Sequence, residues 1–188
     1  MRKYELKKRA ESQRETRLRI VEATMELHRE KGPARTSMSE VARRAGVERR
    51  TLYRHFPDPA ALQTACSGLF LQRSPLPDAD QWATLAGEAR LLRGLTELYG
   101  FYARNEKLLS RVIADAEIDE LTREINQSRF GPGLAALRSA LAQVLPRRKA
   151  VRAMLDLALE FGTWQRLCQS GLASDAAART MVRALLAV

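Results

Sequence analysis

The stretch TSMSEVARRAGVERRTLYRHFPD, residues 36–58, decides how this chain folds. Hydroxyl side chains at Thr36 and Ser37 stand just before a short apolar-periodic segment, the position that N-caps of helices occupy. Gly46 ends that segment, because glycine adopts the positive φ of a tight turn at the least cost. A second short helix is expected from about residue 48 to residue 55. The stretch therefore predicts a helix, a tight turn and a second helix.

The two short helices share an inward apolar face and leave a polar outward face. The core that fixes their angle is expected from Val41, Ala42, Ala45, Val47, Leu52 and Phe56. The outward positions of the second helix are Arg49, Arg50, Thr51, Tyr53, Arg54 and His55. Arginine donates two hydrogen bonds to guanine, the threonine methyl meets that of thymine, and tyrosine and histidine bond phosphates. The pattern favours a helix that reads the major groove; the alternative is a helical hairpin with a solvated charged face.

The segments on either side of this motif are also helical in pattern. Residues 14–31 carry apolar side chains at three- and four-residue steps, and Gly32-Pro33 ends that helix. After the break at Pro57, Asp58 is placed to cap a fourth helix that has proline in its first position. Residues 1–13 are polar and basic, and we interpret them as a flexible arm or a frayed extension of the first helix.

The rest of the chain shows helical periodicity and no strand-type alternation. Two prolines in residues 74–78 indicate a linker. Breaks are expected near Gly131-Pro132-Gly133, Pro146 and Gly171. The expected helices are residues 80–104, 106–115, 117–145, 148–170 and 174–187. The fold class is therefore all-α, and the chain divides into an arm (1–13), a segment that holds the motif and its connecting helix (14–72), and a helical C-terminal segment (73–188).

The charge is concentrated in the N-terminal third. The formal net charge is +10, and residues 1–56 hold 16 Lys+Arg and 8 Asp+Glu, a net of +8. Such a region attracts a polyanion, either nucleic acid or an anionic membrane surface. A membrane-binding helix needs a large apolar face, yet residues 1–17 offer only Tyr4, Leu6 and Ala10. DNA is therefore the favoured partner, and a membrane partner is not expected.

The motif and its surroundings resemble the tetracycline-repressor (TetR) family of bacterial regulators. The resemblance is carried by residues 36–47, residues 51–58 and Leu62, extends over about residues 14–70, and is weaker around residues 161–172. It implies a DNA-binding three-helix unit, a linking helix, and a C-terminal domain that binds a small-molecule effector and forms a homodimer, as in a repressor released by its ligand. The family's phosphate contacts would fall on Thr36, Tyr53 and His55, and its base-reading positions on Ser39, Arg49, Arg50, Thr51 and Tyr53. Ser37 and Arg54 complete the candidate DNA-binding set.

Three positions depart from the family's pattern. Glu48 replaces a frequent serine and would either read a cytosine amino group or cap the helix. Pro59 replaces a lysine that contacts phosphate, and the basic arm is the candidate that would compensate for this loss. His28 replaces a frequent aromatic residue and is interpreted as a packed or half-exposed side chain.

Other chemistry is not indicated by the sequence. It contains no phosphate-loop, dinucleotide, nucleophile-elbow or zinc-protease motif, so neither an enzyme nor a cofactor is expected. Cys66 and Cys168 stand alone, which favours packing over a metal or disulfide and leaves redox sensing open. The polar N-terminus and the lack of a long apolar run predict a cytoplasmic protein.

The C-terminal half supplies candidates for an effector pocket and a dimer interface. The pocket candidates are the aromatic residues Tyr99, Tyr102, Phe130, Phe161 and Trp164. The alternative is that they pack in the hydrophobic core. The residues expected to pair with their two-fold copies in a four-helix bundle are Leu155, Ala158, Leu159, Leu167, Met181, Val182, Leu185 and Leu186.

Overall fold

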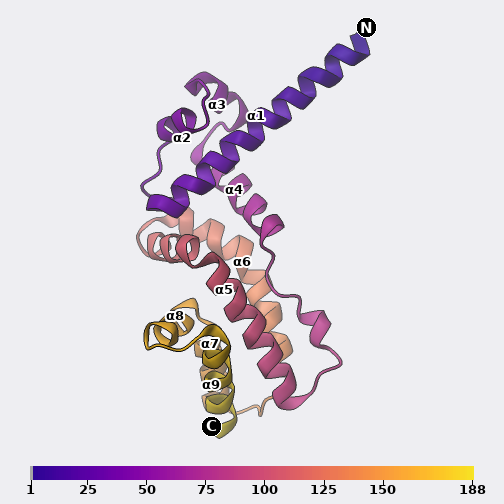
Figure 1. Ribbon diagram of the computed structural model, residues 1–188, viewed down its shortest axis with the longest axis vertical. Coiled ribbons are helices and arrows are strands. Elements are labelled where there is room, and N and C mark those ends of the chain that lie inside the picture. The colour runs from indigo at the N-terminus through magenta and orange to yellow at the C-terminus, as the bar shows by residue number, and fades with distance from the viewer. Residues whose placement is uncertain (1) are drawn as a thin grey trace. The chain divides into compact units, whose positions relative to one another are not determined.

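The computed structural model describes residues 2–188, without the side chains of residues 2, 3 and 6. Every regular element in that range is helical, which confirms the all-α class (Figure 1). The chain forms two compact units, one of residues up to Arg73 with Lys107–Arg129, the other of Ser74–Glu106 with Phe130–Val188. The linker near residue 74 thus marks a boundary, but residues 73–188 are not one unit, because residues 107–129 pack with the N-terminal unit.

Helix α1 (Arg2–Lys31) is longer than the sequence suggested. The flexible arm expected for residues 1–13 is wrong from Arg2 onward, where the chain is already helical; Met1 lies outside the described residues. The segment contains neither glycine nor proline, and it places Glu5 four residues before Arg9, a spacing that favours a helix. Because the distal half of α1 is anchored in a core, the costly first turn is already formed and the helix propagates outward.

The N-terminal unit packs α1 against α2 (Met38–Arg44) and α4 (Pro59–Arg73). Ile20, Met25 and Leu27 of α1 are buried there. His28 is buried as well, with Nδ1 3.8 Å from Cys66 Sγ of α4, which agrees with its interpretation as a packed side chain. Burial lowers the pKa of His28 to about 4 and raises that of the Cys66 thiol to about 12.

The structure confirms two predicted helix ends: the C-terminus of α1 at Gly32 and the N-terminus of α4 at Asp58. Gly32 adopts φ +91° after the last turn of α1 and donates its N–H to the His28 carbonyl at 3.0 Å. Asp58 caps α4 by accepting the Ala61 N–H at 2.7 Å, with Pro59 as the first helical residue.

The middle of the chain differs from the expected helix boundaries. Residues 79–82 form a short 3₁₀ helix (η1, Ala79–Trp82), and α5 (Gly87–Ile118) is one helix without an interruption near residue 105. Helix α6 (Glu120–Ala142) continues through Pro132, so the break expected at residues 131–133 is wrong. A proline removes one backbone donor, and the turns after it are held because Leu137 and Leu141 are buried. A Cβ at Gly133 would stand 2.5 Å from Leu76 Cδ1, so this glycine allows close packing.

The helix expected over residues 148–170 is divided at Glu160, which has an extended backbone. It forms α7 (Lys149–Leu159) and α8 (Phe161–Gln169), followed by α9 (Ser174–Ala187). The freed carbonyls of Ala158 and Leu159 accept the hydroxyls of Tyr99 and Tyr102 at 2.9 and 2.5 Å. The two tyrosines replace the amide donors that a continuous helix would have supplied. The buried carbonyls therefore keep hydrogen-bond donors although the helix is interrupted.

The apolar stripe assigned to a dimer interface is mostly used inside the C-terminal unit. Leu155, Ala158, Leu159, Met181, Val182 and Leu185 are buried, and Leu167 is half-buried. Leu186 of that set is 50% exposed, and Leu157, which was not in it, is 46% exposed. The stripe therefore needs no partner to cover most of it. Among the described residues, no helix is both long and apolar enough to cross a membrane.

Candidate nucleic-acid interface

The N-terminus of α2 is fixed by reciprocal side-chain hydrogen bonds. Ser37 is the N-cap: its Oγ accepts the Glu40 N–H at 3.3 Å, and Glu40 Oε2 accepts the Ser37 N–H at 3.1 Å. This capping box satisfies two backbone donors that a helix start leaves open. Gly46 then turns the chain with φ +64°, as its position in the motif predicted.

The two short helices are locked by the core expected from the sequence. Val41, Ala42, Ala45, Leu52 and Phe56 are buried. Val47 is half-buried, because it stands at the turn rather than between the helices. Helix α3 (Arg49–His55) thus turns Leu52 inward and fixes which of its other positions face solvent.

The outward face of α3 is rich in cations that have no partner among the described side chains. Arg49, Arg50, Tyr53 and Arg54 occupy positions i, i+1, i+4 and i+5, which lie on one side of a helix. All four are exposed, Tyr53 by 42%. Within residues 2–188 as described, the three arginines make no hydrogen bond or ion pair, so their donors are available to a ligand.

Two other predicted site residues make hydrogen bonds within the chain, and two more are half-buried. Thr36 donates its hydroxyl to the Gly32 carbonyl at 2.7 Å, and the Ser37 hydroxyl donates to Glu40 Oε2 at 2.8 Å. Thr51 is half-buried. The ring nitrogen Nε2 of His55 is buried without a hydrogen-bond partner among the described groups, and burial beside Arg54 and Arg17 lowers the pKa of this side chain. His55 Nε2 therefore reaches a phosphate only if the ring turns, whereas Ser39 is exposed.

Arg17 of α1 supports helix α3, a role that the sequence did not indicate. Its guanidinium carbon lies 4.1 Å from the centroid of the Phe56 ring, and its Nη1 donates to the His55 carbonyl at 3.2 Å. A cation at the last carbonyls of a helix is favourable for the helix dipole. The contact spans 38 residues, so no local periodicity signals it.

Two sets of ion pairs hold α2 against α1. Lys31 pairs with Glu40 at 2.5 Å, and Arg44 makes two 2.8 Å contacts with the carboxylate of Glu30 and a 3.3 Å contact with Glu26. Hydrogen bonds from Lys31 and Ser37 lower the pKa of Glu40 to about 2. The Arg44 pairs are solvent-exposed and the Lys31–Glu40 pair is half-buried, so these pairs orient α2 more than they stabilise it.

Glu48 precedes α3 as its N-cap residue but makes no side-chain cap hydrogen bond. The capping role considered from the sequence is therefore not observed. The carboxylate is exposed beside Arg49, next to the positive end of the helix.

In the C-terminal unit, four of the five aromatic pocket candidates form one cluster. Tyr102 lies 5.4 Å from Phe161 and 5.9 Å from Trp164 between ring centroids, and Phe161 lies 5.3 Å from Trp164. Tyr99 stacks on Tyr102 at 6.2 Å. All four are buried, and Phe130 is half-buried. The rings fill the space between them, as an ordinary core does.

The capped short helix, the glycine turn and the cationic helix define a helix-turn-helix regulator on an all-helical frame. Residues 20–66 match the model of the bacterial regulatory proteins of the tetR family. This match confirms, over residues 20–66, the resemblance to the tetR family of DNA-binding regulators that the sequence indicated. The matched family is one of regulators, not enzymes.

Solved structures agree on the fold. A tetR-family regulator from Streptomyces coelicolor is 19% identical, with a TM-score of 0.63 over 93% of this chain and 80% of that one. NalD, the secondary repressor of a multidrug efflux pump in Pseudomonas aeruginosa, is 23% identical, with a TM-score of 0.61 over 93% and 96%. FadR from Bacillus subtilis, bound to stearoyl-CoA, is 18% identical, with a TM-score of 0.61 over 89% and 96%. No curated protein sequence matches the chain.

Proposed function

We propose that the protein is a repressor that binds operator DNA as a homodimer and leaves it when a small apolar effector binds. The observation that carries this proposal is the exposed face of α3, where Arg49, Arg50 and Tyr53 have no competing partner in the described chain. A seven-residue helix of this kind fits the major groove, where base edges differ in their donors and acceptors.

The proposed division of labour follows from side-chain chemistry. Arg49 and Arg50 reach guanine edges, and Thr51 and Ser39 contact neighbouring bases. Tyr53 and Arg54 donate to phosphates, which set the register of the helix without reading sequence. Thr36 and Ser37 contribute through the start of α2, which their hydroxyls already shape.

The effector is proposed to act at the aromatic cluster of the C-terminal unit. FadR holds stearoyl-CoA, an amphipathic molecule with a long apolar acyl chain, which supports an effector with an apolar part for a protein of this fold. The cluster formed by Tyr99, Tyr102, Phe161 and Trp164 is closed by its own rings, so a ligand there must separate α8 from α5. A ligand shifts the protein between two states only by its difference in affinity for them.

The homodimer is proposed to form through α7 and α9. Leu157 and Leu186 are the exposed leucines of these helices, and α7 packs against α9 within the C-terminal unit. A two-fold dimer presents two recognition helices, which must enter major grooves about 34–36 Å apart. Sedimentation of the protein and of the Leu157→Glu/Leu186→Glu variant tests this: the wild type should be a dimer at micromolar concentration and the variant a monomer.

Selection of bound duplexes from a random-sequence pool tests the DNA proposal. The selected duplex should lose roughly 10- to 100-fold in affinity on Arg49→Ala or Arg50→Ala, with relaxed base preference at one position. The matched control is Arg123→Ala, an exposed arginine of α6, which should bind as the wild type does. Equal losses on selected and random duplexes would refute base reading by the two arginines.

A further inference from the structure

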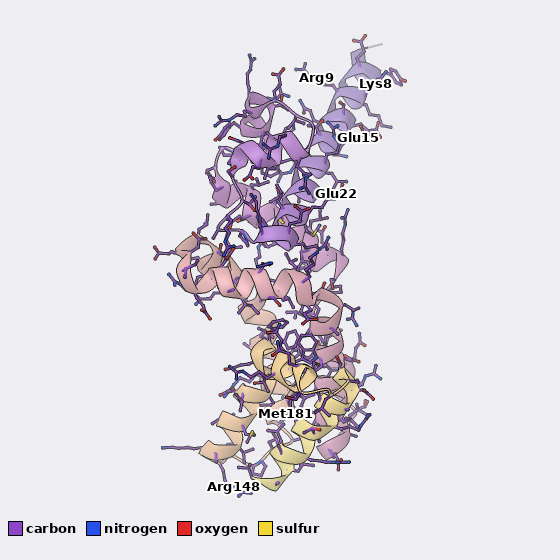
Figure 2. The ribbon with its side chains drawn as sticks, turned by 60° about the vertical axis from the view of Figure 1, so that its left-hand side comes forward. Lys8, Arg9, Glu15, Glu22, Arg148 and Met181 are labelled. Carbon is purple, nitrogen blue, oxygen red and sulfur yellow. The ribbon has the colours of Figure 1, made fainter. Side chains whose placement is uncertain are left out.

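The first turns of α1 leave the core of the N-terminal unit (Figure 2). Every described side chain from Tyr4 to Glu15 is exposed, and the first buried residue is Ile20. At 1.5 Å per residue, the helix before Ile20 is about 27 Å long. We call residues 2–14 the α1 extension. Its described side chains bury no apolar face, so their packing does not explain the length of the helix.

The extension carries its cations next to the recognition helix. Lys8, Arg9 and Arg54 line one open, polar hollow of about 450 Å³ together with Glu5, Ser12 and Gln13. Lys8 and Arg9 come from α1, whereas Arg54 is the sixth residue of α3. In the described chain, these three cations form no ion pair, although Glu5 lines the same hollow. The excess of positive charge and the polar walls fit a phosphate group, not an apolar ligand.

Arg54 belongs both to the outward face of α3 and to the hollow that Lys8 and Arg9 line. This shared residue indicates that the hollow binds the same DNA duplex as α3. A duplex bound to the outward face of α3 places its backbone beside the groove that α3 enters, so its phosphates pass the end of α3 where Arg54 stands. The hollow is then filled by the same molecule. The spacing of Lys8 and Arg9 also depends on the helix: if residues 2–14 were coil, their position next to Arg54 would not be defined.

We propose that the α1 extension is a second DNA-binding element, in which Lys8 and Arg9 hold a backbone phosphate together with Arg54, and that it works as a rigid helix. This rests on the proposed function of α3. The extension adds affinity without sequence preference, because phosphate contacts carry no base information. It also compensates for Pro59, which leaves the start of α4 without a cation.

Two variants separate charge from rigidity. Lys8→Ala/Arg9→Ala removes the cations and keeps a helix former at both positions. Ala10→Pro keeps every charge but breaks the exposed helix, since proline lacks the backbone donor and clashes with the preceding turn. The matched control is Arg147→Ala/Lys149→Ala, which removes two exposed cations from the C-terminal unit. Arg49→Ala serves as the reference for base reading.

Each protein is titrated with a duplex selected from the random pool and with a scrambled duplex of equal length, across salt concentrations. Both extension variants should bind the two duplexes roughly 10- to 100-fold more weakly and to the same extent. For a dimer, the magnitude of the log–log salt slope should fall by about 2, because one phosphate contact is lost in each subunit. Arg49→Ala should instead reduce the preference for the selected duplex, and the control should behave as the wild type.

The possible failures are distinguishable. If Ala10→Pro binds as the wild type while Lys8→Ala/Arg9→Ala does not, the extension acts as a flexible tail and the rigid element is refuted. If neither variant changes binding while Arg49→Ala loses base preference, the second element is refuted and the function of α3 stands. If the wild type binds neither duplex, both proposals fail. Helical content by circular dichroism checks that Ala10→Pro loses only the first turns.

Discussion

Gly32 joins a strained backbone to a buried carboxylate, and Gly32→Ala should destabilise the N-terminal unit. The glycine has φ +91°, and a Cβ built on it would stand 2.1 Å from Oδ2 of Asp115, which is 5% exposed. The same oxygen accepts the Ala34 N–H at 2.9 Å. Asp115 therefore ties α5 to the loop that leads into α2, and an alanine at residue 32 must displace it.

The magnitude follows from two separate terms. An L-residue in the left-handed region costs about 1–2 kcal/mol. Displacing the carboxylate breaks the hydrogen bond from the Ala34 N–H to Asp115. Losing such a bond costs about 1–3 kcal/mol for buried groups. The free energy of unfolding should thus fall by about 2–5 kcal/mol, with no change in the denaturant slope that would indicate a different denatured state.

Gly46→Ala is the matched control for the backbone term. Gly46 lies in the same unit with φ +64°, and a Cβ there would meet nothing within 4 Å. Denaturant unfolding followed by circular dichroism should show a smaller loss for Gly46→Ala than for Gly32→Ala. In the background of Asp115→Ala, the two glycine variants should become similar, because the obstructing carboxylate is gone. If Gly32→Ala costs no more than Gly46→Ala in the wild-type background, the steric argument is refuted.

Three further predictions concern salt, pH and the division of the C-terminal helices. Binding of a selected duplex by the dimer should have a log–log salt slope of about −7 to −9, for about 8–10 phosphate contacts; a slope near zero excludes DNA binding. The pKa of His28 is lowered from 6.5 to about 4, so the unfolded chain binds more protons between these pH values, and the free energy of unfolding should fall as the pH falls from 6.5 to 4. The loss should reach about 3 kcal/mol and shrink in His28→Gln, and pH titrations of denaturant midpoints measure both. Tyr102→Phe should cost about 1–3 kcal/mol in the same assay, because the Leu159 carbonyl loses its buried donor, whereas exposed Tyr53→Phe should be neutral.

The features that the sequence predicted well are set by neighbours along the chain. The Ser37 cap, the turn at Gly46 and the Asp58 cap each depend on residues within four positions. The inward face of the motif follows from helical periodicity, so its core could be named in advance. The exposed arginines of α3 follow from the same pattern, because positions that are not inward must face outward.

The features that the sequence missed depend on contacts between distant segments. The division at Glu160 is stable because Tyr99 and Tyr102, 57–59 residues earlier, donate to the freed carbonyls. Proline and glycine near residue 132 predicted a break, yet buried leucines on the following turns keep α6 continuous. The support of α3 by Arg17 has the same origin. The apolar stripe of the C-terminal helices is a similar case, because its sequence pattern does not distinguish burial within the chain from burial against a partner.

The structure sorts the charges around the motif in a way that suits a polyanion. Glu26, Glu30 and Glu40 are all paired with Arg44 or Lys31, so these carboxylates are neutralised on the side where α2 meets α1. The arginines at positions 49, 50 and 54 have no carboxylate partner in the described chain, although Glu48 is exposed beside Arg49 and Glu5 lines the same hollow as Arg54. A surface salt bridge contributes little to stability, so pairing these acids gains the fold little. The consequence of this pairing is electrostatic. Unpaired cations set the potential over α3, and the paired acids that anchor α2 do not cancel the attraction of these cations for phosphate.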